Sequence, residues 1–270
     1  MTFQPLLPFS GYPGWAFLSR TLEQQQTTFE QGSLVSRQVK NFSDNIASIK
    51  TAEQLVNDRQ LLEVSLGAFG LEEDINSKAF IQQILESSTL DPTSLASRLS
   101  DKRYLEFTKA FGFGDFDVPR TQLSDFSNEI TSKFLDKKFE IAVGDQDSNM
   151  RLALAADRDL DAVANRNISD TAKWFSMMGN APLRQVFDTA FGMSSNFAAL
   201  DLDKQLNVFQ DRAQRDYGAT TIEQFSDPAL REKLIRNFLI RSEAQNFSAK
   251  ASAGQTALTL LQSAGPRSFF

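Results

Sequence analysis

Two residue types are missing altogether: the 270-residue sequence contains no cysteine and no histidine. Without cysteine there is no disulfide, no thiolate nucleophile and no cysteine-based zinc or iron–sulfur site. Without histidine there is no imidazole base, no Ser-His-Asp triad and no imidazole metal ligand. Only carboxylate, lysine or tyrosine catalysis and oxygen-ligand metal sites remain. The composition therefore favours a protein that is not an enzyme and uses no cofactor.

A basic excess is also lacking, since the net charge is −6 and the isoelectric point is about 4.9. Such a chain offers no cationic surface on which phosphates could be neutralised, so nucleic acid is not an expected partner. No apolar run reaches the length that spans a bilayer. The first twenty residues have no basic region and are interrupted by Pro5, Pro8 and Pro13, which argues against a secretory signal peptide.

Tyrosine and tryptophan are scarce, with 3 and 2 residues, whereas phenylalanine occurs 24 times. Because phenylalanine has no polar group, most of these rings are expected to be buried between helices. A phenylalanine-lined ligand cavity is the alternative, but apolar stripes at helical spacing more often form core. No segment alternates as a strand does, and the hairpin dipeptides Asn-Gly and Asp-Gly do not occur. The sequence predicts an all-α fold.

A pattern near the start of the chain returns in a looser form near its end. Helix-like runs close on Ala68-Phe69-Gly70 and on Ala190-Phe191-Gly192, and Ser-Asp pairs open a further helix-like run after each. Two such copies predict two diverged helical repeats around a Phe-rich core, with each phenylalanine buried just before a helix-ending glycine. The residues that define this repeat are Phe69, Gly70, Asp101, Phe191, Gly192 and Asp227.

The breaks between helix-like runs predict five parts of the chain. They are an irregular arm (1–13), a first repeat region (14–118), a central helical segment (119–181), a second repeat region (182–245) and a loosely structured tail (246–270).

Two short motifs resemble ligand-binding loops without their defining residues. The run that starts at Asp145 opens like a calcium-binding loop, but Met150 and Ala156 stand where glycine and glutamate are needed. Gly112 and Gly114 lack the third glycine and the preceding strand of a dinucleotide-binding motif. A helix cap and a turn are the better interpretations, and we expect no metal or cofactor site.

One polar cluster could support catalysis. Lys102 next to Tyr104 is conceivable as an acid–base pair, because a neighbouring lysine lowers the pKa of a tyrosine. The structural alternative is a helix capped by Asp101, in which Arg103 holds neighbouring helices in register. The pair Ser226-Asp227 recurs without the Arg-Tyr, which favours the structural alternative.

The two ends of the chain are the candidate contact sites for a protein partner. The segment before Arg20 carries no charged side chain and contains three prolines, so it must either pack on the body or stay available to a partner. The candidate partner-binding residues are Phe3, Leu6, Leu7, Phe9 and Trp15 near the start and Phe269 and Phe270 at the end.

Three segments, LLEVSLGAFGLEEDINSKAFIQQILE, LASRLSDKRYLEFTKAFGFG and FEIAVGDQDSNMRLAL, resemble a bacterial family of unknown function. PLRQVFDTAFGM and LREKLIRNFLIRSEAQ fit the same pattern, so the resemblance covers nearly the whole chain. Members of that family are commonly encoded among flagellar genes. The resemblance implies an all-helical protein with a role in flagellar assembly or structure, and it supplies no catalytic residues.

Three functions follow as hypotheses. The first is a non-enzymatic structural or interaction protein of the flagellum, located in the cytoplasm or exported by the flagellar apparatus. Its uncharged N-terminal arm has the character typical of flagellar export signals. The second is a cytoplasmic helical adaptor or export chaperone for a flagellar subunit. The third is an enzyme based on carboxylate or lysine chemistry.

Overall fold

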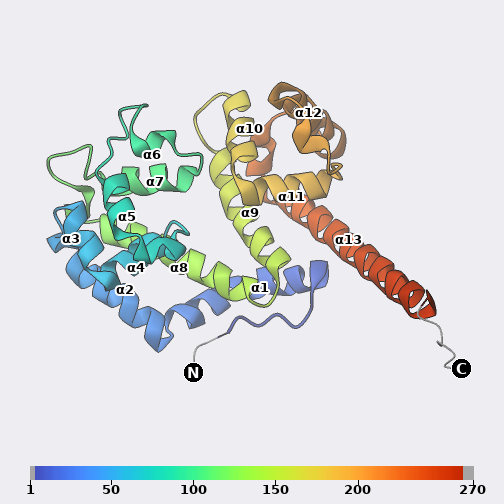
Figure 1. Ribbon diagram of the computed structural model, residues 1–270, viewed down its shortest axis with the longest axis horizontal. Coiled ribbons are helices and arrows are strands. Elements are labelled where there is room, and N and C mark those ends of the chain that lie inside the picture. Colours follow the sequence, from blue (N-terminus) through green and yellow to red (C-terminus); the bar gives the residue numbers. More distant parts are fainter. Residues whose placement is uncertain (1–3, 264–270) are drawn as a thin grey trace, which may run out of the picture. The chain divides into compact units, whose positions relative to one another are not determined.

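The computed structural model describes residues 4–263, with side chains up to residue 247 (Figure 1). Over this part of the chain every regular element is an α-helix or a short 3₁₀-helix, and no strand occurs. The all-α prediction is confirmed. Phenylalanine provides many of the fully buried side chains, so the prediction of a Phe-rich core is confirmed as well.

Contacts divide the chain into two compact units. Unit 1 comprises Met1–Leu6 and Thr21–Val143, and unit 2 comprises Leu7–Arg20 and Gly144–Phe270. Helix α1 (Gly11–Glu30) contributes its first half to unit 2 and its second half to unit 1. The sequence did not predict this division, which splits the central segment 119–181 between the two units.

Unit 1 is organised around four phenylalanines that lie between its helices. Phe111 makes edge contacts with Phe107 and Phe126, both at 5.0 Å between ring centroids, and Phe134 from α8 packs against Gly67. Besides the second half of α1, the elements are α2 (Ser33–Asn45), η1 (Ile46–Ser48), α3 (Ala52–Asn57), α4 (Arg59–Gly67), η2 (Glu72–Asn76), α5 (Lys78–Leu85), α6 (Leu95–Arg98), α7 (Lys102–Phe111), η3 (Arg120–Gln122) and α8 (Phe126–Gly144).

Unit 2 has an aromatic core of the same kind. The ring of Phe187 lies 5.3 Å from Phe191, 5.5 Å from Phe225 and 6.0 Å from Trp174. Besides the first half of α1, the elements are α9 (Ser148–Ala164), α10 (Asp170–Gly179), α11 (Ala181–Phe191), η4 (Phe197–Ala199), α12 (Leu202–Tyr217), η5 (Ile222–Ser226) and α13 (Pro228–Ser263).

The two Phe-Gly positions of the predicted repeat have the same local geometry. Gly70 and Gly192 adopt φ angles of 68° and 67°, a left-handed conformation that glycine adopts without strain. The following N–H reaches back to a carbonyl of the last turn, from Leu71 to Leu66 at 3.0 Å and from Met193 to Asp188 at 2.8 Å. Both glycines therefore end a helix in a Schellman motif.

Phe69 and Phe191 are buried, as the sequence predicted. They differ in one detail. Phe191 is the last residue of α11, whereas regular helix in α4 ends at Gly67 and Phe69 lies in the turn that follows.

The order of elements around the two positions is similar, except that the fifth element is an α-helix in unit 1 and a 3₁₀-helix in unit 2. In unit 1, α3, α4, η2, α5, α6 and α7 follow one another, and in unit 2 the order is α10, α11, η4, α12, η5 and α13. The Asp101 carboxylate accepts the N–H of Arg103 at 3.0 Å at the start of α7, and the Asp227 carboxylate accepts that of Ala229 at 2.9 Å at the start of α13. The corresponding helices differ in length, since α7 has 10 residues and α13 has 36.

Both predicted boundaries of the irregular ends are wrong. Helix α1 begins at Gly11, inside the expected arm, so the irregular part among the described residues is 4–10. Helix α13 continues to Ser263, so residues 246–263 are helical instead of loosely structured. The sequence here is rich in small and polar residues, but it contains no proline that would end the helix before Pro266.

Candidate functional site

The N-terminal arm, residues 4–10, is fixed through its backbone. The N–H of Leu6 donates to Oε1 of Gln25 at 2.7 Å, and Nε2 of the same glutamine donates to the Leu6 carbonyl at 3.3 Å. The Gln25 side chain is itself buried. Because the backbone supplies the attachment, the Leu6 side chain stays 59% exposed, and Phe9 is 61% exposed. The Leu6 side chain is thus presented to solvent from a held backbone.

The other predicted contact residues have different positions. Leu7 is half-buried, and Phe3, Phe269 and Phe270 lie outside the described residues. Trp15 is 3% exposed and belongs to the core of unit 2, where its Nε1 donates to Oε2 of Glu232 at 2.7 Å. The prediction that Trp15 offers a partner surface is therefore wrong. Burial of the large apolar indole ring stabilises the fold, and Glu232 accepts the hydrogen bond from its N–H.

The start of α1 lies beside α13 within unit 2. The Trp15–Glu232 hydrogen bond joins the two helices, and the carboxylate of Glu243 occupies the space next to Gly11, where a Cβ atom would clash with it. In the part of α13 whose side chains are described, residues 228–247, two large apolar side chains are exposed, Ile240 at 51% and Phe247 at 77%. Sequence reasoning missed both, because Ile240 directly follows a stripe of buried residues and Phe247 falls in a segment expected to be irregular.

The polar cluster in unit 1 does not form the acid–base pair that the sequence suggested. The Tyr104 hydroxyl donates to Oδ2 of Asp74 at 2.7 Å, while Lys102 Nζ donates to the carbonyls of Ser97 and Leu99, both at 2.9 Å. Burial and this hydrogen bond to Asp74 raise the pKa of Tyr104 to about 12. The tyrosine therefore keeps its proton at neutral pH and links α7 to η2, which is the structural alternative.

Arg103 reinforces the same corner of unit 1. Its guanidinium group binds the Asp101 carboxylate, with Nη2 2.6 Å from Oδ2, and Nη1 donates to the carbonyl of Gly70. The hydrogen bonds from Arg103 hold the pKa of Asp101 below its usual value. Asp101 thus caps α7 and orients the arginine that satisfies the end of the neighbouring helix.

A second polar cluster lies where α12 meets α13 in unit 2. Arg215 forms two hydrogen bonds with the Asp216 carboxylate, at 2.7 and 2.9 Å, and Lys233 Nζ donates to the Asp216 carbonyl at 2.6 Å. Asn237 donates to the Tyr217 hydroxyl at 3.0 Å, and burial raises the pKa of Tyr217 to about 12. These groups satisfy one another and lock the end of α12 against α13.

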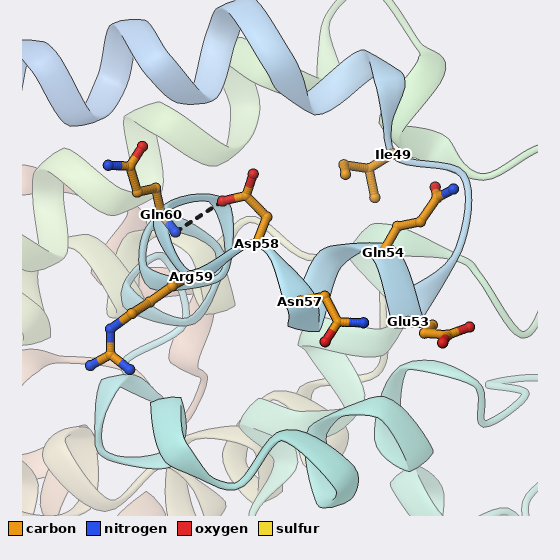
Figure 2. Close-up of a pocket in the computed structure, with 7 residues that line it drawn as sticks. All are labelled: Ile49, Glu53, Gln54, Asn57, Asp58, Arg59 and Gln60. Atoms are coloured by element: carbon orange, nitrogen blue, oxygen red, sulfur yellow. Dashed lines mark hydrogen bonds between the residues drawn. The ribbon is translucent and has the colours of Figure 1, made fainter.

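An open groove of about 710 Å³ lies between α3 and the start of α4 (Figure 2). The carboxylate of Asp58 accepts the N–H groups of Gln60 and Leu61, both at 3.0 Å, and so caps α4. Figure 2 shows that Glu53 and Arg59 point away from each other. The groove therefore has no converging set of polar groups of the kind that orients a small ligand. It is lined by Ile49, Glu53, Gln54, Asn57, Asp58, Arg59 and Gln60.

Two kinds of site are absent from the described part of the chain. Residues 4–263 contain no group of three or more acidic side chains placed to hold a metal ion. Within the same residues, no helix combines the length and the apolar character needed to cross a membrane.

The family model described as "Protein of unknown function (DUF1217)" matches residues 68–230, more than half of the chain. The chain belongs to the DUF1217 family. The match begins at Ala68, within the first Phe-Gly turn, and ends at Leu230, the third residue of α13. It thus contains both Phe-Gly positions and leaves the N-terminal arm and most of α13 outside.

A solved structure supports the fold of this DUF1217 chain. The crystal structure of protein AGR_C_984 from Agrobacterium tumefaciens shares 24% sequence identity with it, at a TM-score of 0.71. The comparison covers 90% of this chain and 100% of the other. At this identity the likeness is one of fold. A search of curated proteins found no match.

Proposed function

We propose that the chain is a non-enzymatic structural or interaction protein of the bacterial flagellum, which acts by binding other proteins. The observation that carries the proposal is in the N-terminal arm, where Gln25 holds the backbone of Leu6 while the Leu6 side chain is exposed. The Phe9 side chain in the same segment is exposed as well. Apolar side chains presented from a fixed backbone lose little conformational freedom when a partner covers them. The flagellar setting comes from the family resemblance of the sequence.

The chemistry of the two polar clusters is consistent with this proposal. In unit 1 Tyr104 donates to Asp74 and Arg103 pairs with Asp101. In unit 2 Arg215 pairs with Asp216 and Asn237 donates to Tyr217. The pKa values of Asp101 and Asp216 are held below their usual value by hydrogen bonds from arginine, and those of Tyr104 and Tyr217 are raised to about 12, so these four groups are shifted away from the neutral range that acid–base catalysis uses.

The test replaces the chromosomal gene by a double variant, Leu6→Ser with Phe9→Ser, so that the cells make no wild-type protein. We expect impaired motility with an unchanged melting temperature, because both side chains are exposed and contribute little to the fold. Leu90→Ser with Phe116→Ser is the matched control, since it removes an exposed leucine and phenylalanine from unit 1. Normal motility in the arm variant would contradict the proposal.

Location then separates the structural role from the adaptor role. A structural protein is expected in the flagellar fraction, whereas an export chaperone stays in the cytoplasm and binds one subunit there. Fractionation of cells that carry the tagged full-length chain distinguishes the two. If the tagged chain is recovered neither with flagella nor with a flagellar subunit, the structural role and the adaptor role are both contradicted.

A further inference from the structure

Cationic side chains gather in unit 2 around the end of α12. The last two residues of this helix, Asp216 and Tyr217, are held by α13. Lys233 Nζ donates to the Asp216 carbonyl at 2.6 Å and lies 5.0 Å from the centre of the Tyr217 ring. Asn237 donates to the Tyr217 hydroxyl at 3.0 Å, and Arg236 directly precedes Asn237. These contacts place cations of α13 beside the end of α12.

Two further arginines belong to the same place. Arg212 lies on α12 four residues before Asp216, the spacing at which helical side chains are neighbours. The guanidinium group of Arg241 lies beside Gly192, at the end of α11. The ring of the phenylalanine before this glycine stacks on Tyr217 at 5.7 Å. Arg212 and Arg241 therefore approach the end of α12 from two different helices.

The electrostatics of Asp216 agree with this placement. The hydrogen bonds from Arg215 lower the pKa of Asp216, and the charges of Arg212 and Arg241 act in the same direction. We call this group of side chains the cationic cluster. Its members are Arg212, Arg215, Lys233, Arg236 and Arg241.

Most of the cationic cluster is not neutralised within the protein. Arg215 pairs with Asp216. Within residues 4–247, no hydrogen bond or ion pair engages the guanidinium groups of Arg212, Arg236 and Arg241. Arg236 and Arg241 are exposed, and Arg212 is half-buried. Three arginines with free donors thus gather at one place in a chain whose net charge is −6.

A structural role explains part of the cationic cluster. Cations near the C-terminal end of a helix interact favourably with the helix dipole. Lys233 does so through the backbone carbonyl at the end of α12, and Arg241 lies beside the end of α11. Arg236 has no such position, because it lies in the interior of α13. The dipole also leaves the N–H donors of these arginines without an acceptor.

The free donors suit carboxylates. An arginine binds a carboxylate through two parallel hydrogen bonds, a geometry that lysine cannot offer. Arg215 shows this geometry within the protein, since its Nε and Nη2 reach the two oxygens of Asp216 at 2.7 and 2.9 Å. A long polyanion such as nucleic acid would also meet the acidic remainder of the chain. A short acidic segment interacts mainly with charges within about 10 Å and avoids this repulsion.

We infer that the cationic cluster at the end of α12 binds a short acidic segment of another protein, whose carboxylates pair with Arg212, Arg236 and Arg241. The inference rests on the proposed protein-binding role and deepens it, because it names the chemistry of a partner and a surface. The two ideas fail separately. The motility test changes Leu6 and Phe9, whereas the binding test changes only arginines of the cationic cluster.

The experiment is fluorescence anisotropy of a labelled oligoglutamate peptide titrated with the full-length chain. We expect binding that weakens as salt is added, because exposed charge pairs are screened. Arg212→Gln with Arg241→Gln should raise the dissociation constant about fivefold or more, since two charge pairs are lost. Arg37→Gln with Arg59→Gln is the matched control, because it removes two exposed arginines from unit 1 and changes the net charge equally. This control is expected to bind like the wild type.

Three outcomes would overturn the inference. One is a wild-type chain that does not bind oligoglutamate even at low salt. Another is an equal loss of affinity in both double variants, which would assign the binding to overall charge. The third is tighter binding of an oligodeoxynucleotide than of oligoglutamate by the wild type, which would assign the cationic cluster to nucleic acid.

Thermal melts of each variant check the fold, and glutamine is a residue that favours helix. If Arg212→Gln with Arg241→Gln melts below the wild type, the single variant Arg236→Gln decides, because this side chain is exposed in the interior of α13. It should raise the dissociation constant about twofold or more. Unchanged binding by Arg236→Gln would then contradict the inference.

Discussion

At three places in this chain an Ala-Phe pair is followed by a glycine in the left-handed conformation. Gly70, Gly112 and Gly192 have φ angles of 68°, 68° and 67°. Gly112 and Gly192 end α7 and α11 directly, and Gly70 closes the turn that follows α4, so that in each case the preceding phenylalanine stays in the aromatic core. Glycine is favoured at these positions because residues with a Cβ atom are strained at this φ angle.

We expect Gly70→Ala to lower the free energy of unfolding by about 1–2 kcal/mol, the cost of a left-handed non-glycine residue. The added Cβ would meet only Arg103, at an ordinary contact distance of 3.5 Å, so the effect reports the φ angle. Gly179→Ala is the control, because Gly179 lies within α10 with nothing within 4 Å. Urea unfolding should show no loss for the control. Equal effects of the two substitutions would contradict the backbone explanation.

Asp101→Ala should cost about 1 kcal/mol at pH 7, the usual value of a helix N-cap. Because the hydrogen bonds from Arg103 hold the pKa of Asp101 below 3.8, the contribution is present above that pH and is lost as the pH falls through the folded-state pKa. The wild type and the variant should therefore converge in stability in urea titrations at acid pH. Asp44→Ala is the control, because Asp44 forms an exposed i,i+4 ion pair with Lys40. A stability difference between the wild type and Asp101→Ala that persists at low pH would contradict the role of the ionised Asp101 carboxylate.

Among the elements, the N-terminal arm and helix α13 share one feature. Leu6 in the arm, and Ile240 and Phe247 on α13, present apolar side chains to solvent from a backbone with defined structure. Elements of this kind suit recognition, since little ordering is needed when a partner binds. They also lie mostly outside the segment that defines the family.

Gln25→Ala should release the arm without unfolding unit 1. The variant removes both hydrogen bonds to Leu6, so protease cleavage within residues 4–10 should become faster while the melting temperature changes little. Limited proteolysis followed by mass spectrometry measures the effect. Gln24→Ala is the control, because its exposed side chain lies one residue away. Unchanged cleavage in Gln25→Ala would show that other contacts hold the arm.

At the scale of the whole molecule, the two units do not coincide with the two predicted repeat regions, 14–118 and 182–245. Unit 1 needs α8, whose Phe126 lies 5.0 Å from Phe111 and whose Phe134 packs against Gly67. Unit 2 needs the first half of α1, which supplies Trp15 to its core. Each unit is thus completed by a segment outside its own predicted repeat region, α8 beyond residue 118 for unit 1 and the first half of α1 for unit 2.

We expect neither of the fragments 1–118 and 119–270 to fold alone. The first lacks α8 and the second lacks Trp15, so each would expose part of an aromatic core. Mixing the two fragments should restore helicity and a cooperative thermal transition, as measured by circular dichroism against the intact chain. Cooperative unfolding of fragment 1–118 by itself would contradict this account of the units.

Local features of this protein could be predicted from its sequence because neighbouring residues encode them. The helical spacing of apolar residues predicted the all-α fold, and the Phe-Gly pairs predicted buried rings beside helix-ending glycines at 69–70 and 191–192. The Ser-Asp pairs predicted the starts of α7 and α13. Each depends on contacts within one or two helical turns, which a short stretch of sequence specifies.

The tertiary structure alone decided which apolar residues face solvent. Trp15, Leu6 and Phe9 belong to one uncharged segment, yet Trp15 is buried through a hydrogen bond to Glu232, 217 residues away, while the other two stay exposed. The same holds for the place of α8 in unit 1 and for the exposed side of α13. Composition and periodicity identify an apolar face, but the face becomes core or contact surface only when distant segments pack against it, and that pairing is a property of the folded chain.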